Sequence, residues 1–141
     1  MCRILEELGD TLANRRPDLP DANSPYALLE HCLGVMEYWG GHLIHGRETN
    51  RDRPAEFRAS GPVGPLVRRA EQALVQLERD VRQSTARDSL RNQPDPAVLG
   101  PDAELTPSFV LVHVFEELAQ HHGHMEITRD VLCRESGAGA E

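Results

Sequence analysis

Four histidines, together with glutamates, crowd into fifteen residues near the C-terminal end of the chain. The stretch reads HVFEELAQHHGHMEI, residues 113–127, and its apolar residues keep the spacing of a helix. At about 100° per residue, one face of this helix collects a polar ladder within an arc of roughly 80°. The ladder consists of His113, Glu117, His121, His124 and Thr128. His122 points to the far side, about 180° from His113. The ladder must face water or line a site.

Glu117 and His121 are the pair with ligand spacing, because residues four apart meet over one helical turn. A carboxylate and an imidazole placed this way can share one metal ion, as the paired ligands of HExxH helices do. A third ligand must come from another helix, and His31 in the apolar run LLEHCLGVM is the candidate. Spacing alone leaves two alternatives open: a core histidine bonded to a backbone carbonyl at position 31, and a ladder that faces solvent.

Four segments carry a helical period, and no stretch shows a convincing strand alternation. The expected helices cover residues 1–14, 24–45, 62–84 and 106–134. Ser24 and Thr106 each stand before a proline, which is a cap followed by the first helical position. Gly46 is expected to end the second helix.

The polar stretch RETNRDRPAEFRASG, residues 47–61, has no clear period and is read as a long connection that crosses from one end of the molecule to the other. The pattern predicts an all-α, four-helix bundle with this crossover between its second and third helices. Residues 1–135 are expected to form one domain, and residues 136–141 a disordered tail.

Composition narrows the function classes. The net charge of −8 disfavours nucleic acid and anionic lipid as partners, since both need a cationic surface. The basic residues are all arginine, which excludes lysine Schiff-base chemistry. Three scattered cysteines suit a reducing compartment, and Cys32 is expected to be a small core residue. No apolar run is long enough for a membrane span, and Met1 leads into a charged amphipathic segment. A soluble, cytoplasmic protein is therefore expected.

Three stretches carry a family resemblance: LLEHCLGVMEYW, RDRPAEFRASGPV and LVHVFEELAQHHGHMEITRDVL. The last looks like an E-x-x-x-H-x-G-H signature. The chain resembles the DinB-like superfamily, in particular the mini-circle protein branch, which is related to mycothiol-dependent maleylpyruvate isomerases. The resemblance implies a four-helix bundle with a crossover and a divalent metal ion, zinc or nickel. Its ligands would be His31 from the second helix and Glu117 and His121 from the last. A homodimer is also expected from the family.

A site with two histidines and one glutamate has the layout of catalytic zinc, and the same set suits iron. Such a metal lowers the pKa of a bound thiol or water. The resemblance implies thiol-dependent transfer or isomerisation of a small molecule, with mycothiol or a similar low-molecular-weight thiol as cosubstrate.

Other residues are candidates around that site. His113 and His124, on the ligand face, are candidates to support a ligand or act as acid or base. Arg51, Arg53 and Arg58 are candidates to bind carboxylates of the thiol or of the substrate, and the alternative is that they belong to a solvated loop. Two other functions stay open: a non-catalytic metal- or ligand-binding bundle with a role in stress response, and a metal-dependent hydrolase that needs no thiol.

Overall fold

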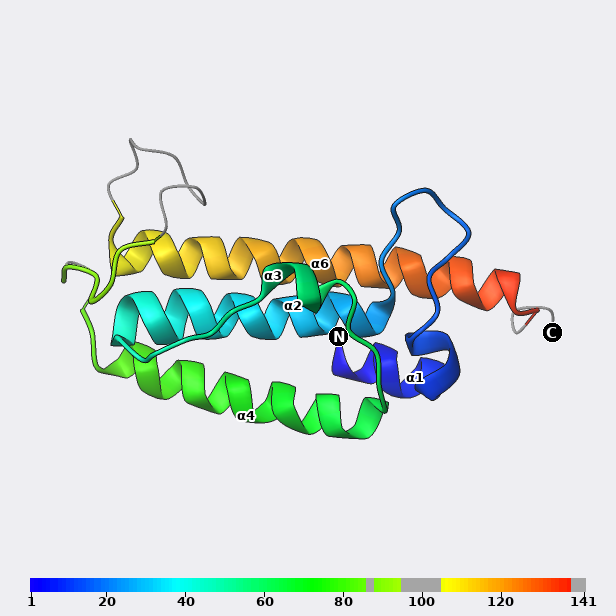
Figure 1. Ribbon diagram of the computed structural model, residues 1–141, viewed down its shortest axis with the longest axis horizontal. Coiled ribbons are helices and arrows are strands. Elements are labelled where there is room, and N and C mark those ends of the chain that lie inside the picture. The colour runs from blue at the N-terminus through cyan, green and yellow to red at the C-terminus, as the bar shows by residue number, and fades with distance from the viewer. Residues whose placement is uncertain (86–87, 95–104, 138–141) are drawn as a thin grey trace.

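The computed structural model describes residues 1–85, 88–94 and 105–137, and these are all-helical with no strand. The all-α prediction is therefore confirmed. The elements in chain order are α1 (Cys2–Ala13), α2 (Pro25–Val35), η1 (Met36–His45), α3 (Arg53–Glu56), α4 (Val63–Arg82) and α6 (Pro107–Glu135). Helix η1 continues α2 without a break, so the two form a single rod (Figure 1). The long helices lie close to the expected ranges.

The rod of α2 and η1 lies alongside α6, and α4 flanks the rod on its other side (Figure 1). Helix α1 is short and packs against α2, α4 and α6 at one end of the molecule. The connecting segment, residues 47–62, runs back along α2 from the end of η1 to the start of α4 (Figure 1). It carries α3 against α2, and this contact brings the connecting segment to the middle of the rod.

Helix starts follow the sequence signals. The Ser24 hydroxyl accepts a hydrogen bond from the Ala27 amide at 3.2 Å, and the Thr106 hydroxyl accepts one from Phe109 at 3.2 Å. Each bond satisfies one of the amides that a helix N-terminus leaves without an intrahelical partner. Gly46, in the left-handed conformation, ends η1 as expected. Both capped starts and this stop are confirmed.

The expected loop at residues 47–61 was wrong at one place, because it contains the one-turn helix α3. The Asp52 carboxylate caps it by accepting from the Ala55 amide at 3.0 Å, and Pro54 occupies its first turn. A four-residue helix is too short to show a hydrophobic period, so periodicity could not detect it.

The second long helix also differs from an ordinary helix, since its last ten residues are wound as a π-helix. Within this part, a side chain at Gly41 would overlap the guanidinium of Arg47. Arg47 in turn donates to the buried Asp80 of α4 at 2.8 Å, and Gln76 donates to the other oxygen of Asp80 at 2.8 Å. This pair ties the end of η1 to α4.

The core lies between the long helices, and Cys32 is fully buried in it, as expected. Burial, followed by the nearby Glu117 carboxylate, raises the pKa of the Cys32 thiol to about 12. Helix α6 ends at Glu135, and residues 138–141 of the expected tail lie outside the described residues. Across the described part of the chain, none of the helices has the length and apolar character needed to cross a membrane.

Candidate metal centre

His31 lies in the middle of α2 with both ring nitrogens facing carboxylates. Its Nδ1 is 2.8 Å from Oε2 of Glu56 on α3, and its Nε2 is 3.3 Å from Oε2 of Glu117 on α6. The imidazole is buried between these two helices. His31 is therefore not a core histidine bonded to a backbone carbonyl, which was one alternative left open by the sequence.

The three expected ligands lie together. The ligand atoms of His31, Glu117 and His121 all lie within 4.8 Å of one another. Oε2 of Glu117 is 3.3 Å from Nε2 of His31 and also 3.3 Å from Nε2 of His121. Ligands held at about 2.0–2.2 Å around one tetrahedral ion are about 3.3–3.6 Å apart, so this spacing fits a metal ion. Metal binding itself stays a prediction.

The site lies at the border between core and solvent. The side chain of His31 is only 3% exposed, whereas those of His121 and Glu117 remain 15% and 26% exposed. The rings of His31 and His121 meet edge to face, with centroids 4.8 Å apart. One ligand is thus fixed in the core while the other two leave the site reachable from outside.

His121 has one ring nitrogen facing Glu117, and the other, Nδ1, is buried without a hydrogen-bond partner among the described residues. Burial, followed by repulsion from His31, lowers the pKa of His121, although the Glu117 carboxylate opposes the change. The lowered pKa favours the neutral imidazole, which is the form that binds a metal.

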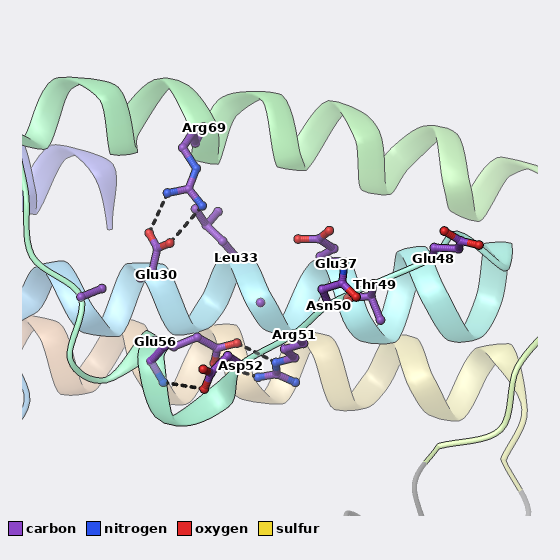
Figure 2. A pocket seen from close by; sticks show the side chains of 13 residues that line it. Glu30, Leu33, Glu37, Glu48, Thr49, Asn50, Arg51, Asp52, Glu56 and Arg69 are labelled. Carbon is purple, nitrogen blue, oxygen red and sulfur yellow. Dashed lines mark hydrogen bonds and ion pairs between the residues drawn. The ribbon is translucent and has the colours of Figure 1, made fainter.

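A second carboxylate, Glu56, stands behind His31 and was missed by sequence reasoning. Arg51 donates from Nε to its Oε1 at 2.7 Å and from Nη2 to its Oε2 at 3.1 Å (Figure 2). Burial of Glu56 favours its neutral form, but the hydrogen bonds from His31 and Arg51 outweigh burial and lower its pKa. Arg51 was expected to bind a carboxylate of the thiol or substrate, whereas in the structure its guanidinium is paired with Glu56 of the chain itself.

Gly34, one turn after His31, makes room for this arrangement. A side chain at this position would overlap the Glu56 carboxylate and come close to the Arg51 guanidinium. The neighbouring Phe57 covers the face of the His31 ring, with centroids 4.6 Å apart and planes 27° from parallel. His31 is therefore enclosed along one edge and one face by the connecting segment.

The sequence profile of one family, described as "MST: Mycothiol-S-transferase", matches residues 1–133. The chain belongs to the mycothiol S-transferase family. This family falls within the DinB-like superfamily, so the resemblance seen in the sequence is confirmed. No curated protein and no solved structure gives a significant match.

The two further histidines of the ladder lie outside the group of three ligands. His113 meets the ring of Trp39 edge to face at 4.4 Å and is half-buried. His124 is exposed, and its ring centroid is 6.2 Å from that of His121. His122 is exposed on the other side of α6, where it lines a separate apolar cavity with Cys32 and Leu118. Of these, His124 is the one whose ring packs next to a ligand.

The remaining arginines of the connecting segment lie outside the ligand group. Arg53 is exposed and places its guanidinium 5.2 Å from the centre of the Phe57 ring. Arg58 is exposed one residue further on. Neither contacts the three ligands, although the contact with Phe57 puts Arg53 near the face of His31.

A cavity of about 520 Å³ opens between the connecting segment, α2 and α4 (Figure 2). Its lining is strongly charged, and Arg69 spans it with two hydrogen bonds to Glu30, at 3.0 and 2.9 Å. Arg51 and Glu56 line it as well, but none of the three ligands does. The cavity therefore lies behind the candidate metal ligands, on the far side of the Arg51–Glu56 pair.

Proposed function

We propose that the protein is a metal-dependent S-transferase that joins the sulfur of mycothiol, or a similar small thiol, to a small electrophilic molecule. One observation carries this proposal: two imidazoles and a carboxylate converge in a chain of the mycothiol S-transferase family. We further propose that the long helices form the DinB-type four-helix bundle. The connecting segment 47–62 would be its crossover, and residues 1–135 one domain.

In this proposal His31, Glu117 and His121 hold a divalent metal ion. Zinc or nickel suits two imidazoles and a carboxylate, and iron is also compatible with the set. When bound, such an ion lowers the pKa of a thiol so that the thiolate is available near neutral pH. The partial exposure of Glu117 and His121 leaves the site open to a thiol from solvent.

The transfer breaks the S–H bond of the thiol, forms a sulfur–carbon bond and breaks one bond at that carbon. The electron pair of the broken carbon bond leaves with the departing group of the electrophile, and a base must accept the proton of the thiol. His124 is the candidate, because it is exposed and its ring lies beside that of His121. His113 is held against Trp39 and is assigned a supporting role. Arg53 and Arg58 are candidates to bind a negatively charged group of the substrate.

The proposal is tested on untagged protein loaded with zinc, with mycothiol and an electrophile whose thioether product fluoresces. Turnover should need both metal and thiol, and Glu117→Ala should abolish it because the carboxylate is shared between both histidines. Stoichiometric metal without turnover would indicate a binding protein instead. Hydrolysis of an ester substrate without thiol would indicate a metal-dependent hydrolase. The homodimer stays a prediction, which light scattering would test.

A further inference from the structure

We propose that Glu56 and Arg51 are positioning residues that fix the His31 ring for metal binding, so that the connecting segment sets the metal affinity. This inference rests on the metal site of the proposed function. It adds residues outside the ligand set, on a segment that contributes no ligand of its own. Its basis is a continuous chain of contacts from Arg51 through Glu56 to His31.

The contact with Glu56 decides which ring nitrogen of His31 carries the hydrogen. Both oxygens of Glu56 already accept hydrogen bonds from the guanidinium of Arg51. Oε2 lies 2.8 Å from Nδ1 of His31, and a carboxylate that faces a guanidinium is an acceptor. Nδ1 must therefore be the donor. In a neutral imidazole this leaves the lone pair on Nε2, the atom that faces Glu117.

Glu56 is not placed to bind the metal directly. Nδ1 and Nε2 lie on different edges of the imidazole ring, and Glu56 occupies the edge opposite the ligand group. Among the described residues, the ligand atoms that gather within 4.8 Å belong to His31, Glu117 and His121 alone. Glu56 therefore acts on a metal through His31.

The connecting segment holds the Glu56 carboxylate in place against His31. Helix α3 is anchored by its Asp52 cap, and Arg16 donates to the Phe57 carbonyl at 2.8 Å. The Phe57 ring stacks on His31, while Gly34 gives the carboxylate access to the surface of α2. Edge and face of the imidazole are thus both fixed by the connecting segment. Partners that orient a metal-binding histidine commonly change metal affinity by about 10- to 100-fold when mutated.

The test compares Glu56→Gln with Glu48→Gln as its matched control. Glu48 lies on the same segment and lines the same cavity, but it is exposed (Figure 2). The amide at position 56 keeps the size of the side chain but cannot accept every bond from Arg51 and His31. We expect the dissociation constant for zinc, measured by competition with a chelating dye, to rise about 10- to 100-fold in Glu56→Gln. Glu48→Gln should match the wild type.

Two further readouts separate positioning from general destabilisation. Gly34→Ala keeps both charges but displaces the carboxylate, so it should also weaken zinc binding and alter the visible spectrum of bound cobalt(II). In the metal-free wild type, nitrogen NMR should show the His31 ring protonated at Nδ1. In Glu56→Gln that preference should be lost. Melting temperatures in chelator monitor folding of each variant.

The outcomes are distinguishable. If the wild type binds zinc, His31→Ala does not, and Glu56→Gln binds within twofold of wild type, the positioning role is overturned and the proposed function stands. A lower melting temperature of Glu56→Gln with unchanged zinc affinity would overturn it equally, because that result describes a purely structural ion pair. If the wild type binds no zinc, nickel or iron, the proposed function fails first.

Discussion

Two arginines of the connecting segment, Arg47 and Arg51, each bind a buried carboxylate, yet the two pairs end on different partners. Arg47 reaches Asp80 on α4, and the second oxygen of Asp80 is occupied by the amide of Gln76. Arg51 reaches Glu56 within the same segment. Both pairs bury an acid that would be costly to leave without a partner. Taken alone, each is an arginine paired with a buried carboxylate.

The two pairs differ in the side chain that also contacts each carboxylate, which is Gln76 at Asp80 and His31 at Glu56. Gln76 is a neutral amide that donates to Asp80, and its side chain carries no ionisable group. The partner of Glu56 is His31, whose other nitrogen faces Glu117 and the ligand group. Both carboxylates are buried, so burial alone does not distinguish the two pairs, and what each pair orients is the informative difference.

The largest expected effect comes from removing His31, the candidate ligand that Arg51 and Glu56 orient. A metal that binds only the folded protein stabilises it by about 4 kcal/mol at a thousandfold excess over its dissociation constant. For a chain of this size that raises the melting temperature by roughly 10 °C. His31→Ala should lose this shift, as measured by calorimetry with zinc and with chelator.

His122→Ala is the control for that measurement, because His122 is exposed on the other side of α6. It should cost under about 0.5 kcal/mol, as surface changes do, and keep the full zinc-dependent shift. If His31→Ala also keeps the shift, the third ligand lies elsewhere.

Breaking the Arg47–Asp80 pair should lower the stability of the fold without lowering its affinity for zinc. Arg47→Ala leaves the Asp80 side chain, which is 1% exposed, without its charged partner. Breaking such a pair costs about 3 kcal/mol. Urea unfolding in chelator should show this loss, while the zinc affinity of the folded protein stays within twofold of wild type. A drop in affinity as large as that of Glu56→Gln would mean that both pairs act through stability alone.

Acid should lower the stability of the metal-free fold in two stages, a smaller effect than the substitutions. The folded pKa of His121 lies below its ordinary value of 6.5, so the unfolded chain takes up protons first and stability falls as pH drops below about 6.5. Glu56, also with a lowered pKa, stabilises above its ordinary value of 4.5, and this contribution is lost as pH falls through its folded pKa. Melting temperatures in chelator should show both stages, and Glu56→Gln only the first. A melting temperature that is constant from pH 7 to 4 would contradict this assignment.

Much of the site could be predicted because its signals are local. The four-residue spacing of Glu117 and His121 follows from helix geometry, and a histidine in the apolar run of α2 suggested the third ligand. The caps at Ser24 and Thr106 set the helix starts for the same reason, since each involves residues three apart.

Glu56 could not be predicted in this way, because its role depends on contacts that sequence spacing does not encode. It lies 25 residues from His31 on a helix of one turn, where no period exists to show which way a side chain points. The available signal was Asp52 followed by Pro54, which marks a helix start and predicts local order in an apparent loop. Gly34 was a second signal, since a glycine one turn from a candidate ligand indicates close approach by another segment.

The burial of Cys32 has a chemical consequence for a protein proposed to handle electrophiles. Cys32 directly follows His31 on α2, but its side chain is fully buried and lines the apolar cavity that also contains His122. With its pKa raised to about 12, only roughly one molecule in a hundred thousand carries the thiolate at pH 7. The thiolate is the form that is alkylated or oxidised, so the packing that builds the core shields this cysteine from electrophiles, whereas Cys2 and Cys133 are only partly buried.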